Sequence, residues 1–331
     1  MFIPKSLSVK FKFLIDPYKT TTIYANIDYV FILRILKNRN FILLLAFILG
    51  LLIGNKIGIW IKYLTVPALA IIMIASFTQF PFKIFLDYRS LLKPALYSIF
   101  FSYFINGAVI LALSWFLIHD KQLWIGFIIL AASPPGVAIP PFARITGGDE
   151  KFTIIGMVST YIAALIIIPL VFIIFIGGSF TQLLKLIILF VEVIIGPMII
   201  SQLLIKFKLD KYIIKFRGSI VNWGFFVITF VIIALNRNLF FKDFKILGFI
   251  SLISIISIFG LWILLNYVLK KLKFTSEVRG SLILFGTIKN SSFAAATAIS
   301  LFSERASVPG AIFSVFLIIY LIIISFLSKK K

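Results

Sequence analysis

The chain has 331 residues, of which 61% are hydrophobic and 13% charged, and its mean hydropathy is +1.13. A soluble domain of this length needs far more polar surface, so the composition excludes that class and indicates a polytopic membrane protein. The formal net charge of +22 favours basic cytoplasmic loops over a nucleic-acid partner, because lysine and arginine collect on that side of membrane proteins.

The first 40 residues show no small-residue cleavage site after a compact apolar core, so a signal peptide is not predicted. Within them, IDYVFILRILKNR (27–39) favours a basic amphipathic helix lying on the cytoplasmic face of the membrane. A lead-in without regular structure is the alternative.

Apolar runs between charged residues and Gly, Pro or Asn breaks predict ten membrane-spanning helices in a single all-α domain from 41 to 328. Their expected ranges are 41–54, 63–81, 94–118, 122–143, 152–176, 182–204, 218–236, 247–269, 280–302 and 307–328. With the N-terminus in the cytoplasm, 24 Lys and Arg residues fall on that side and eight on the other. This bias predicts that both termini are cytoplasmic, including the basic tail 329–331.

Two of the ten segments contain helix breaks at similar depth. The fourth carries AASPPGVAIPPFARITGGD (131–149), whose prolines remove backbone donors, and the ninth carries FGTIKNSS (285–292). These are the fourth spans of two five-span halves, about 41–176 and 182–328. Paired breaks in odd-numbered halves indicate an inverted repeat, which is typical of secondary transporters with a binding site at the membrane midplane.

Both breaks are expected to begin a second half-helix, near Ile139–Pro140 and near Asn290–Ser291. Pro140 suits a first helical turn, and Ser291 with Ser292 suits a cap. The amide ends of the two half-helices would meet at the same depth, where they favour an anion.

Lys289 lies inside the ninth apolar segment, far from other charged residues. A lysine at the bilayer centre costs about 2.5–3.5 kcal/mol on insertion scales, so it is expected to have a partner or a function. Three interpretations are open: a fixed cation beside an anionic substrate, a titrating group that couples protons, or an inert partner of Glu192 or of backbone carbonyls. Arg144 is either a further anion contact or an interfacial arginine.

No enzyme is predicted, since the sequence shows no catalytic carboxylate pair, nucleophile elbow or phosphate loop. Cysteine is absent, which excludes disulfides and thiolate chemistry, and no metal site or cofactor is expected.

At its two breaks the chain resembles the bile acid:sodium symporter family. PPGVAIPPFARITGGDEKFTIIGMVSTYIAALIIIPL is similar to that family's fourth and fifth spans, and GTIKNSSFAAATAISLFSERASVPGAIFSVFLIIY to its ninth and tenth. The resemblance implies a panel domain from spans 1, 2, 6 and 7 and a core domain from the other six. It also implies transport by movement of the panel against the core.

The family's sodium ligands are mostly replaced when the motifs are aligned. Its Ser-Asn pair falls on Ile139 and Pro140, its ninth-span glutamate on Phe285, the glutamine before its asparagine on Lys289, its fifth-span hydroxyls on Thr153 and Met157, and its third-span glutamine on Ser102. Asn290 is retained. Sodium coupling as the family performs it is therefore not expected, and proton coupling through Lys289 is the alternative.

The sequence thus predicts a secondary transporter of a small organic anion in the cytoplasmic membrane. A carboxylate is the leading candidate, and an inorganic oxyanion is the alternative. The candidate substrate-binding residues are Asn290, Lys289, Ser291, Thr287, Ile139, Pro140 and Gly136, with Thr153, Ser102, Glu192 and Arg144 in supporting roles. The expected partners are the substrate and the lipid bilayer, without nucleic acid or an obligate protein. A sodium-independent efflux carrier or uniporter resembling auxin efflux carriers, and a sensor that does not transport, are the alternatives.

Overall fold

The computed structural model describes residues 36, 38–80, 88–177 and 180–328. Within these ranges the chain is helical and contains no strand. Most of the expected amphipathic segment 27–39 and the whole tail 329–331 lie outside the described residues.

Long apolar helices account for nearly all of the described chain. Eight are long and apolar enough to cross a membrane, and two shorter apolar helices, Phe41–Ile53 and Lys121–Ala132, accompany them in the part that the structure describes. The principal helices are α2 (Arg39–Ile53), α3 (Asn55–Ile61), α4 (Thr65–Phe77), α5 (Tyr88–Ile99), α6 (Ala108–Leu117), α7 (Lys121–Ala132), α8 (Ile139–Thr146), α9 (Glu150–Ile176), α10 (Phe180–Phe190), α11 (Gly196–Lys206), α12 (Asp210–Leu235), α13 (Arg237–Lys242), α14 (Phe244–Ile255), α15 (Leu261–Lys271), α16 (Ser276–Thr287), α17 (Ser291–Leu301) and α18 (Val308–Ser328). The all-helical membrane class predicted from composition is confirmed.

Three of the spans join two α-helices through a π-helical stretch, so they bend without breaking. Phe100–Gly107 connects α5 to α6, Val191–Ile195 connects α10 to α11, and Ile256–Gly260 connects α14 to α15. The first of these stretches places Asn106 inside the protein, where its amide Nδ2 donates to the Gly286 carbonyl at 2.7 Å. That bond satisfies a carbonyl near the C-terminal end of α16, which lacks helical partners.

The fourth and ninth segments are interrupted where the sequence predicts. α7 ends at Ala132 and α8 begins at Ile139, while α16 ends at Thr287 and α17 begins at Ser291. Pro140 occupies the first turn of α8, as expected for a residue without an amide proton.

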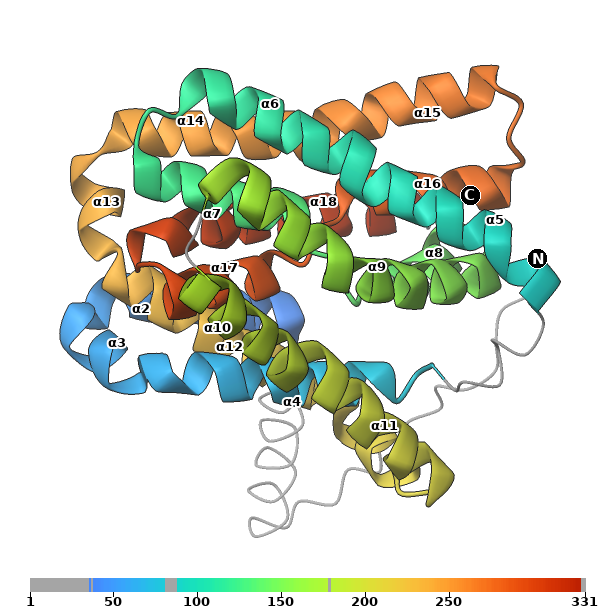
Figure 1. Cartoon of the computed structure of the whole chain (residues 1–331), viewed down its shortest axis with the longest axis horizontal. Helices are drawn as coiled ribbons and strands as arrows, with labels where there is room; N and C mark the ends of the chain where they lie inside the picture. Colours follow the sequence, from blue (N-terminus) through green and yellow to red (C-terminus); the bar gives the residue numbers. More distant parts are fainter. Residues whose placement is uncertain (1–35, 37, 81–87, 178–179, 329–331) are drawn as a thin grey trace, which may run out of the picture.

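The helices pack in two groups (Figure 1). In the first group, α12 lies against α2, α3 and α4, and α11 lies against α4. The second contains α5–α9 and α14–α18, in which α7 and α8 contact α9 and α18 and also reach α17 and α16, respectively. α12 and α4 touch α17 across the boundary, so the second break lies at the interface between the groups.

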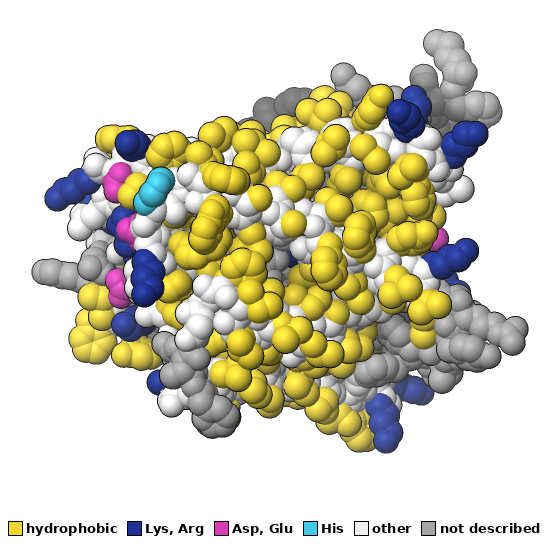
Figure 2. All heavy atoms as spheres, turned by 45° about the horizontal axis from the view of Figure 1, so that its top comes forward, with side chains coloured by type: hydrophobic (Ala, Val, Ile, Leu, Met, Phe, Trp, Pro, Cys, Tyr) yellow, Lys and Arg dark blue, Asp and Glu magenta, His cyan; other side chains and the backbone are white. Residues whose placement is uncertain are grey.

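The outer surface has the distribution of a membrane protein. On the face shown in Figure 2, hydrophobic side chains cover the middle and charged side chains gather at the two ends. At one end Arg305 Nε donates to Asp120 Oδ2 at 2.8 Å. Burial alone would raise the pKa of the Asp120 carboxyl, but hydrogen bonds from the Leu123 amide and from Arg305 outweigh it, and the pKa lies below its usual range.

Candidate functional site

The two helix breaks touch each other. The backbone N–H of Asn290, in the second break, donates to the backbone carbonyl of Pro134, in the first, at 2.8 Å. Gly136 makes the close approach possible, because a Cβ at this position would lie 2.9 Å from Ile288 Cγ2. The chain therefore crosses itself at one point, where α7 and α16 end and α8 and α17 begin.

Asn290 is held on both sides of this crossing. Its Oδ1 accepts from the Phe293 amide at 3.1 Å, which caps α17, and its Nδ2 donates to the Tyr161 hydroxyl at 2.9 Å. The Tyr161 hydroxyl donates in turn to the Pro135 carbonyl at 3.1 Å. The prediction that Ser291 and Ser292 provide the cap is wrong: the helix already begins at Ser291, so the residue before it has the geometry of an N-cap.

Lys289 points in the opposite direction, to the end of α7. Its Nζ donates to the carbonyls of Ala131 at 2.7 Å and Ser133 at 2.9 Å and lies 4.6 Å from the centre of the Tyr103 ring. The side chain is 0% exposed. Carbonyls at a helix C-terminus carry partial negative charge, and an aromatic face attracts a cation. These contacts surround the ammonium.

Glu192 does not take part in this arrangement. It lies in the π-helical stretch between α10 and α11 with its side chain exposed, whereas the partners of the Lys289 ammonium are backbone carbonyls and an aromatic ring. Two kinds of partner were expected if Lys289 is inert, Glu192 or backbone carbonyls. The structure shows the backbone carbonyls.

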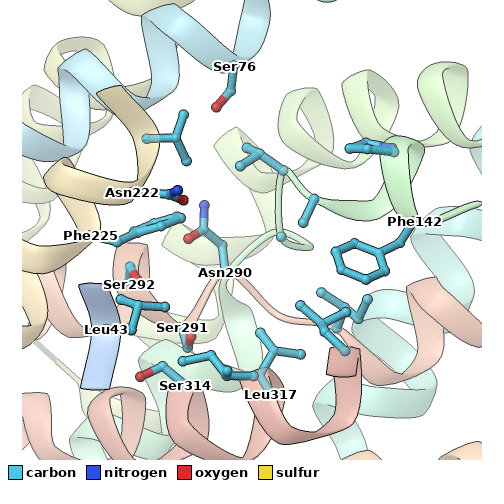
Figure 3. A pocket seen from close by; sticks show the side chains of 18 of the residues that line it. Leu43, Ser76, Phe142, Asn222, Phe225, Asn290, Ser291, Ser292, Ser314 and Leu317 are labelled. Atoms are coloured by element: carbon cyan, nitrogen blue, oxygen red, sulfur yellow. The ribbon is translucent and has the colours of Figure 1, made fainter. Parts of the chain in front are cut away.

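A cavity of about 230 Å³ lies between the two helix groups at the crossing. Figure 3 shows Asn290 near its middle, with Asn222 and Phe225 of α12 on one side and Phe142 of α8 on the other. The exposed Gly218 is among the lining residues, so the cavity reaches the surface near the start of α12. Among the described residues that line it, none is acidic.

The predicted substrate-binding residues divide into two sets. Gly136, Lys289, Asn290 and Ser291 line the cavity. Ile139, Pro140 and Thr287 are buried beside it and do not line it, and the Thr287 hydroxyl donates to the Ile283 carbonyl at 2.7 Å.

The residues expected in supporting roles lie away from the cavity. Arg144 is on the surface, 72% exposed, and forms a two-pronged ion pair with Glu150, in which Nε lies 2.9 Å from Oε2. Thr153 Oγ1 donates to the Glu150 carbonyl at 2.8 Å. Ser102 Oγ is buried and finds no hydrogen-bond partner within the described ranges.

The residues at the aligned sodium-ligand positions supply few side-chain oxygens. Sodium requires several oxygen ligands, but Ile139, Pro140 and Phe285 offer no side-chain oxygen. The carbonyls of Ala131 and Ser133 are occupied by the Lys289 ammonium. Among the described residues, the buried side-chain oxygens without a hydrogen-bond partner are those of Ser98, Ser102, Asn106, Ser257 and Thr297. Of these, Ser102 alone stands at a predicted ligand position.

Arg217 is a cavity residue that the sequence prediction missed. It lies in the second turn of α12 and lines the cavity opposite the crossing. In the sequence it is the last of five cations in 206–217 and was therefore assigned to a cytoplasmic loop. The available signal was its place four positions before Val221, a spacing that puts both residues on one face of a helix.

Comparison with known protein families finds a match. A family model described as the sodium bile acid symporter family matches residues 66–243, which is more than half of the chain. The matched region runs from α4 to α13 and includes the first helix break, whereas Lys289 and Asn290 lie beyond it. A comparison with curated proteins finds no match.

Proposed function

The chain belongs to the sodium bile acid symporter family, and from this premise we propose that it moves a small organic anion across the cytoplasmic membrane. The family consists of transporters rather than enzymes, and the apolar spans make the chain a multi-pass membrane protein. The anion is a carboxylate, and the chain works as a secondary transporter.

The proposed architecture has ten spans in two inverted repeats with both termini in the cytoplasm. The group around α12, together with α10, is the panel, and the group that contains the two breaks is the core. The cavity between the groups supports this division, since alternating access requires a site that each side of the membrane reaches in turn. The panel would move against the core around the crossing.

One observation carries the proposal about coupling: the Lys289 ammonium is bonded to the Ala131 and Ser133 carbonyls at the end of α7. A lysine in this place supplies permanently the positive charge that a bound sodium ion would supply in a sodium-coupled relative. A second cation nearby would meet Coulomb repulsion that is poorly screened in a low dielectric. Transport is therefore independent of sodium.

The preference for an anion is supported by the backbone at the breaks. Asn290 and Ser291 line the cavity at the N-terminus of α17, and Val137 and Ala138 line it just before α8. Helix N-termini present free amide donors and a positive dipole end. With Lys289 close behind, the cavity has a positive potential.

Transport is tested with purified protein in liposomes and a set of radiolabelled small carboxylates. Uptake is expected, with the same initial rate when sodium in the buffer is replaced by N-methylglucamine. A rate that falls at least tenfold without sodium would show that Lys289 has not replaced the ion. Binding of a carboxylate without any uptake would instead favour the sensor.

The role of Lys289 has a second test that does not depend on substrate. Lys289→Ala leaves two buried carbonyls without a donor, which costs about 1–3 kcal/mol. Sodium chloride is expected to raise the melting temperature of this variant more than N-methylglucamine chloride does, while the wild type shows no difference. Lys62→Ala is the matched control, because Lys62 is a partly exposed lysine paired with Glu304 at 3.9 Å. Strong stabilisation of the wild type by sodium would contradict the proposal.

A sodium-independent efflux carrier or uniporter is the second candidate, favoured by the same loss of sodium ligands. The two candidates differ in driving force. A uniporter only equilibrates a carboxylate across the liposome membrane, whereas a coupled carrier accumulates it when a proton gradient is imposed.

A further inference from the structure

We propose that Arg217 binds the carboxylate of the substrate from the α12 side of the cavity. The substrate is then a small monoanion with an apolar body, held between the guanidinium and the N-terminus of α17. This inference rests on the proposed function, and it assigns the anion contact to a residue of the panel.

The guanidinium of Arg217 has unused hydrogen-bonding capacity. Its Nη2 donates to Thr78 Oγ1 at 3.2 Å, and its Nε is buried without a hydrogen-bond partner. No carboxylate lies within ion-pair distance of it among the described residues, and the charged group that acts on it is Asp210, two turns earlier on α12. The Arg217 guanidinium lines the cavity and has an unpartnered N–H, so it can donate a hydrogen bond to an anionic oxygen that enters the cavity.

The free energy of binding favours a carboxylate at this position. A buried donor left unsatisfied costs about 1–3 kcal/mol, which an anionic acceptor recovers. Arginine presents parallel N–H groups that match the two oxygens of a carboxylate. The bond from Thr78 holds one edge of the guanidinium, so less side-chain entropy is lost when the anion binds.

The rest of the cavity sets the size and polarity of the substrate. Apolar side chains make up most of the wall, from Leu43 of α2, Val221 and Phe225 of α12, and Leu317, Ile318 and Leu321 of α18. An apolar cavity of about 150 Å³ accommodates a benzene ring, so a volume of about 230 Å³ suits a single ring or a short branched chain with one carboxylate. The lining contains two cations and, in its described part, no acidic side chain. The Lys289 ammonium is already bonded to two carbonyls, so Arg217 is the cation that remains for a substrate carboxylate, and one negative charge is matched.

The placement of Arg217 also connects binding to movement. Arg217 and Thr78 belong to the α12 group, whereas Asn290 and Ser291 belong to the group of the broken helices. An anion that contacts both sides would link the two groups across the cavity. Its neutral analogue fits the same walls but lacks this link.

The experiment measures binding of benzoate and of benzamide to the purified full-length protein by isothermal titration calorimetry. The two probes share a shape, and only benzoate carries the charge. The wild type is expected to bind benzoate, and Arg217→Gln to bind it about tenfold or more weakly, with benzamide unchanged. Arg217→Lys keeps the positive charge but loses the parallel N–H groups of the guanidinium, so its benzoate affinity should lie between those of the wild type and Arg217→Gln. Arg279→Gln is the control, since Arg279 lines a different cavity on α16.

The outcomes separate this inference from the proposed function. If benzoate binds Arg217→Gln and Arg217→Lys as it binds the wild type, the anion does not contact Arg217 and the inference is overturned, while the transporter remains. If no small carboxylate binds the wild type, the proposed function and the inference both fail. If Arg217→Gln does not fold, Arg217→Lys and Thr78→Val decide, and unchanged benzoate affinity in both overturns the inference.

Discussion

Two adjacent residues at the second helix break perform different electrostatic tasks. Lys289 extends back to the C-terminus of α7, where its ammonium meets carbonyl oxygens, and Asn290 caps the N-terminus of α17. A helix C-terminus prefers a cation, and a helix N-terminus prefers an acceptor. The order lysine then asparagine therefore serves both helix ends from one turn of chain.

The charge of the cavity wall is tested by Asn290→Asp. An aspartate caps a helix as well as an asparagine does, but it loses the donation from Nδ2 to the Tyr161 hydroxyl and buries a carboxylate, so stability should fall by about 1–3 kcal/mol. Benzoate affinity should fall at least tenfold, because a carboxylate now faces the bound anion. Thermal unfolding and titration calorimetry measure the two effects.

Asn290→Ala is the companion variant. It loses both the cap and the bond to Tyr161 without burying a charge, and it is expected to be less stable than the wild type by about 0.5–2 kcal/mol. It should, however, bind benzoate better than the aspartate variant. Wild-type affinity in Asn290→Asp would show that the anion sits elsewhere.

Sequence reasoning found these two residues because a charge and an amide inside an apolar run have no other explanation than a function or a partner. Ile139, Pro140 and Thr287, which were predicted with them, lie at the breaks but do not line the cavity. The sequence locates a break but not the direction in which each of its side chains points. Arg217 follows a run of cations that is typical of a loop, and the apolar pattern predicts a helix only from 218. In the structure α12 begins at Asp210, so Arg217 lies inside the helix.

At the scale of the helices, prolines and polar residues predicted both interruptions, while the contacts that hold them were beyond prediction. α17 and α18 pack closely at Gly310, where a Cβ would lie 2.7 Å from the Ser291 carbonyl oxygen. A glycine in a membrane helix has many explanations, and the sequence does not show which neighbour approaches it. The π-helical stretches could not be predicted either, because their one extra residue per turn leaves no clear pattern in the sequence.

Gly310→Ala tests this contact. The new methyl group meets backbone atoms of α17, which have little freedom to shift, so the variant should lose about 1–3 kcal/mol of stability. Gly248→Ala is the matched control in α14, where a Cβ would have no neighbour within 4 Å. It should be neutral or up to about 1 kcal/mol more stable. Thermal unfolding in detergent compares the two, and equal melting temperatures would mean that α17 and α18 lie further apart.

At the scale of the whole molecule, the two helix groups are hydrogen-bonded to each other at one end and enclose the cavity toward the other. Asn236, at the end of α12, donates to the Glu304 carbonyl at 3.0 Å and lies 3.5 Å from the Ser307 hydroxyl. Lys62 pairs with Glu304 at the same end. The cavity lies toward the start of α12, where Gly218 is exposed. Under the proposed function, movement about the crossing would exchange the closed end for the open one.

A cross-link at the closed end should stop this movement. The chain contains no cysteine, so Asn236→Cys with Ser307→Cys introduces one reactive pair, to be bridged by a short bifunctional methanethiosulfonate. Carboxylate uptake into liposomes should fall below about a tenth of the uncross-linked rate and return after reduction, while benzoate still binds. The control pair, Gly58→Cys with Ala234→Cys, joins α3 to α12 within one group, where a Cβ on Gly58 would lie 3.1 Å from the Ala234 Cβ. Cross-linking this pair should leave uptake unchanged. Undiminished uptake in the cross-linked Asn236–Ser307 pair would show that the two groups do not separate at this end during transport.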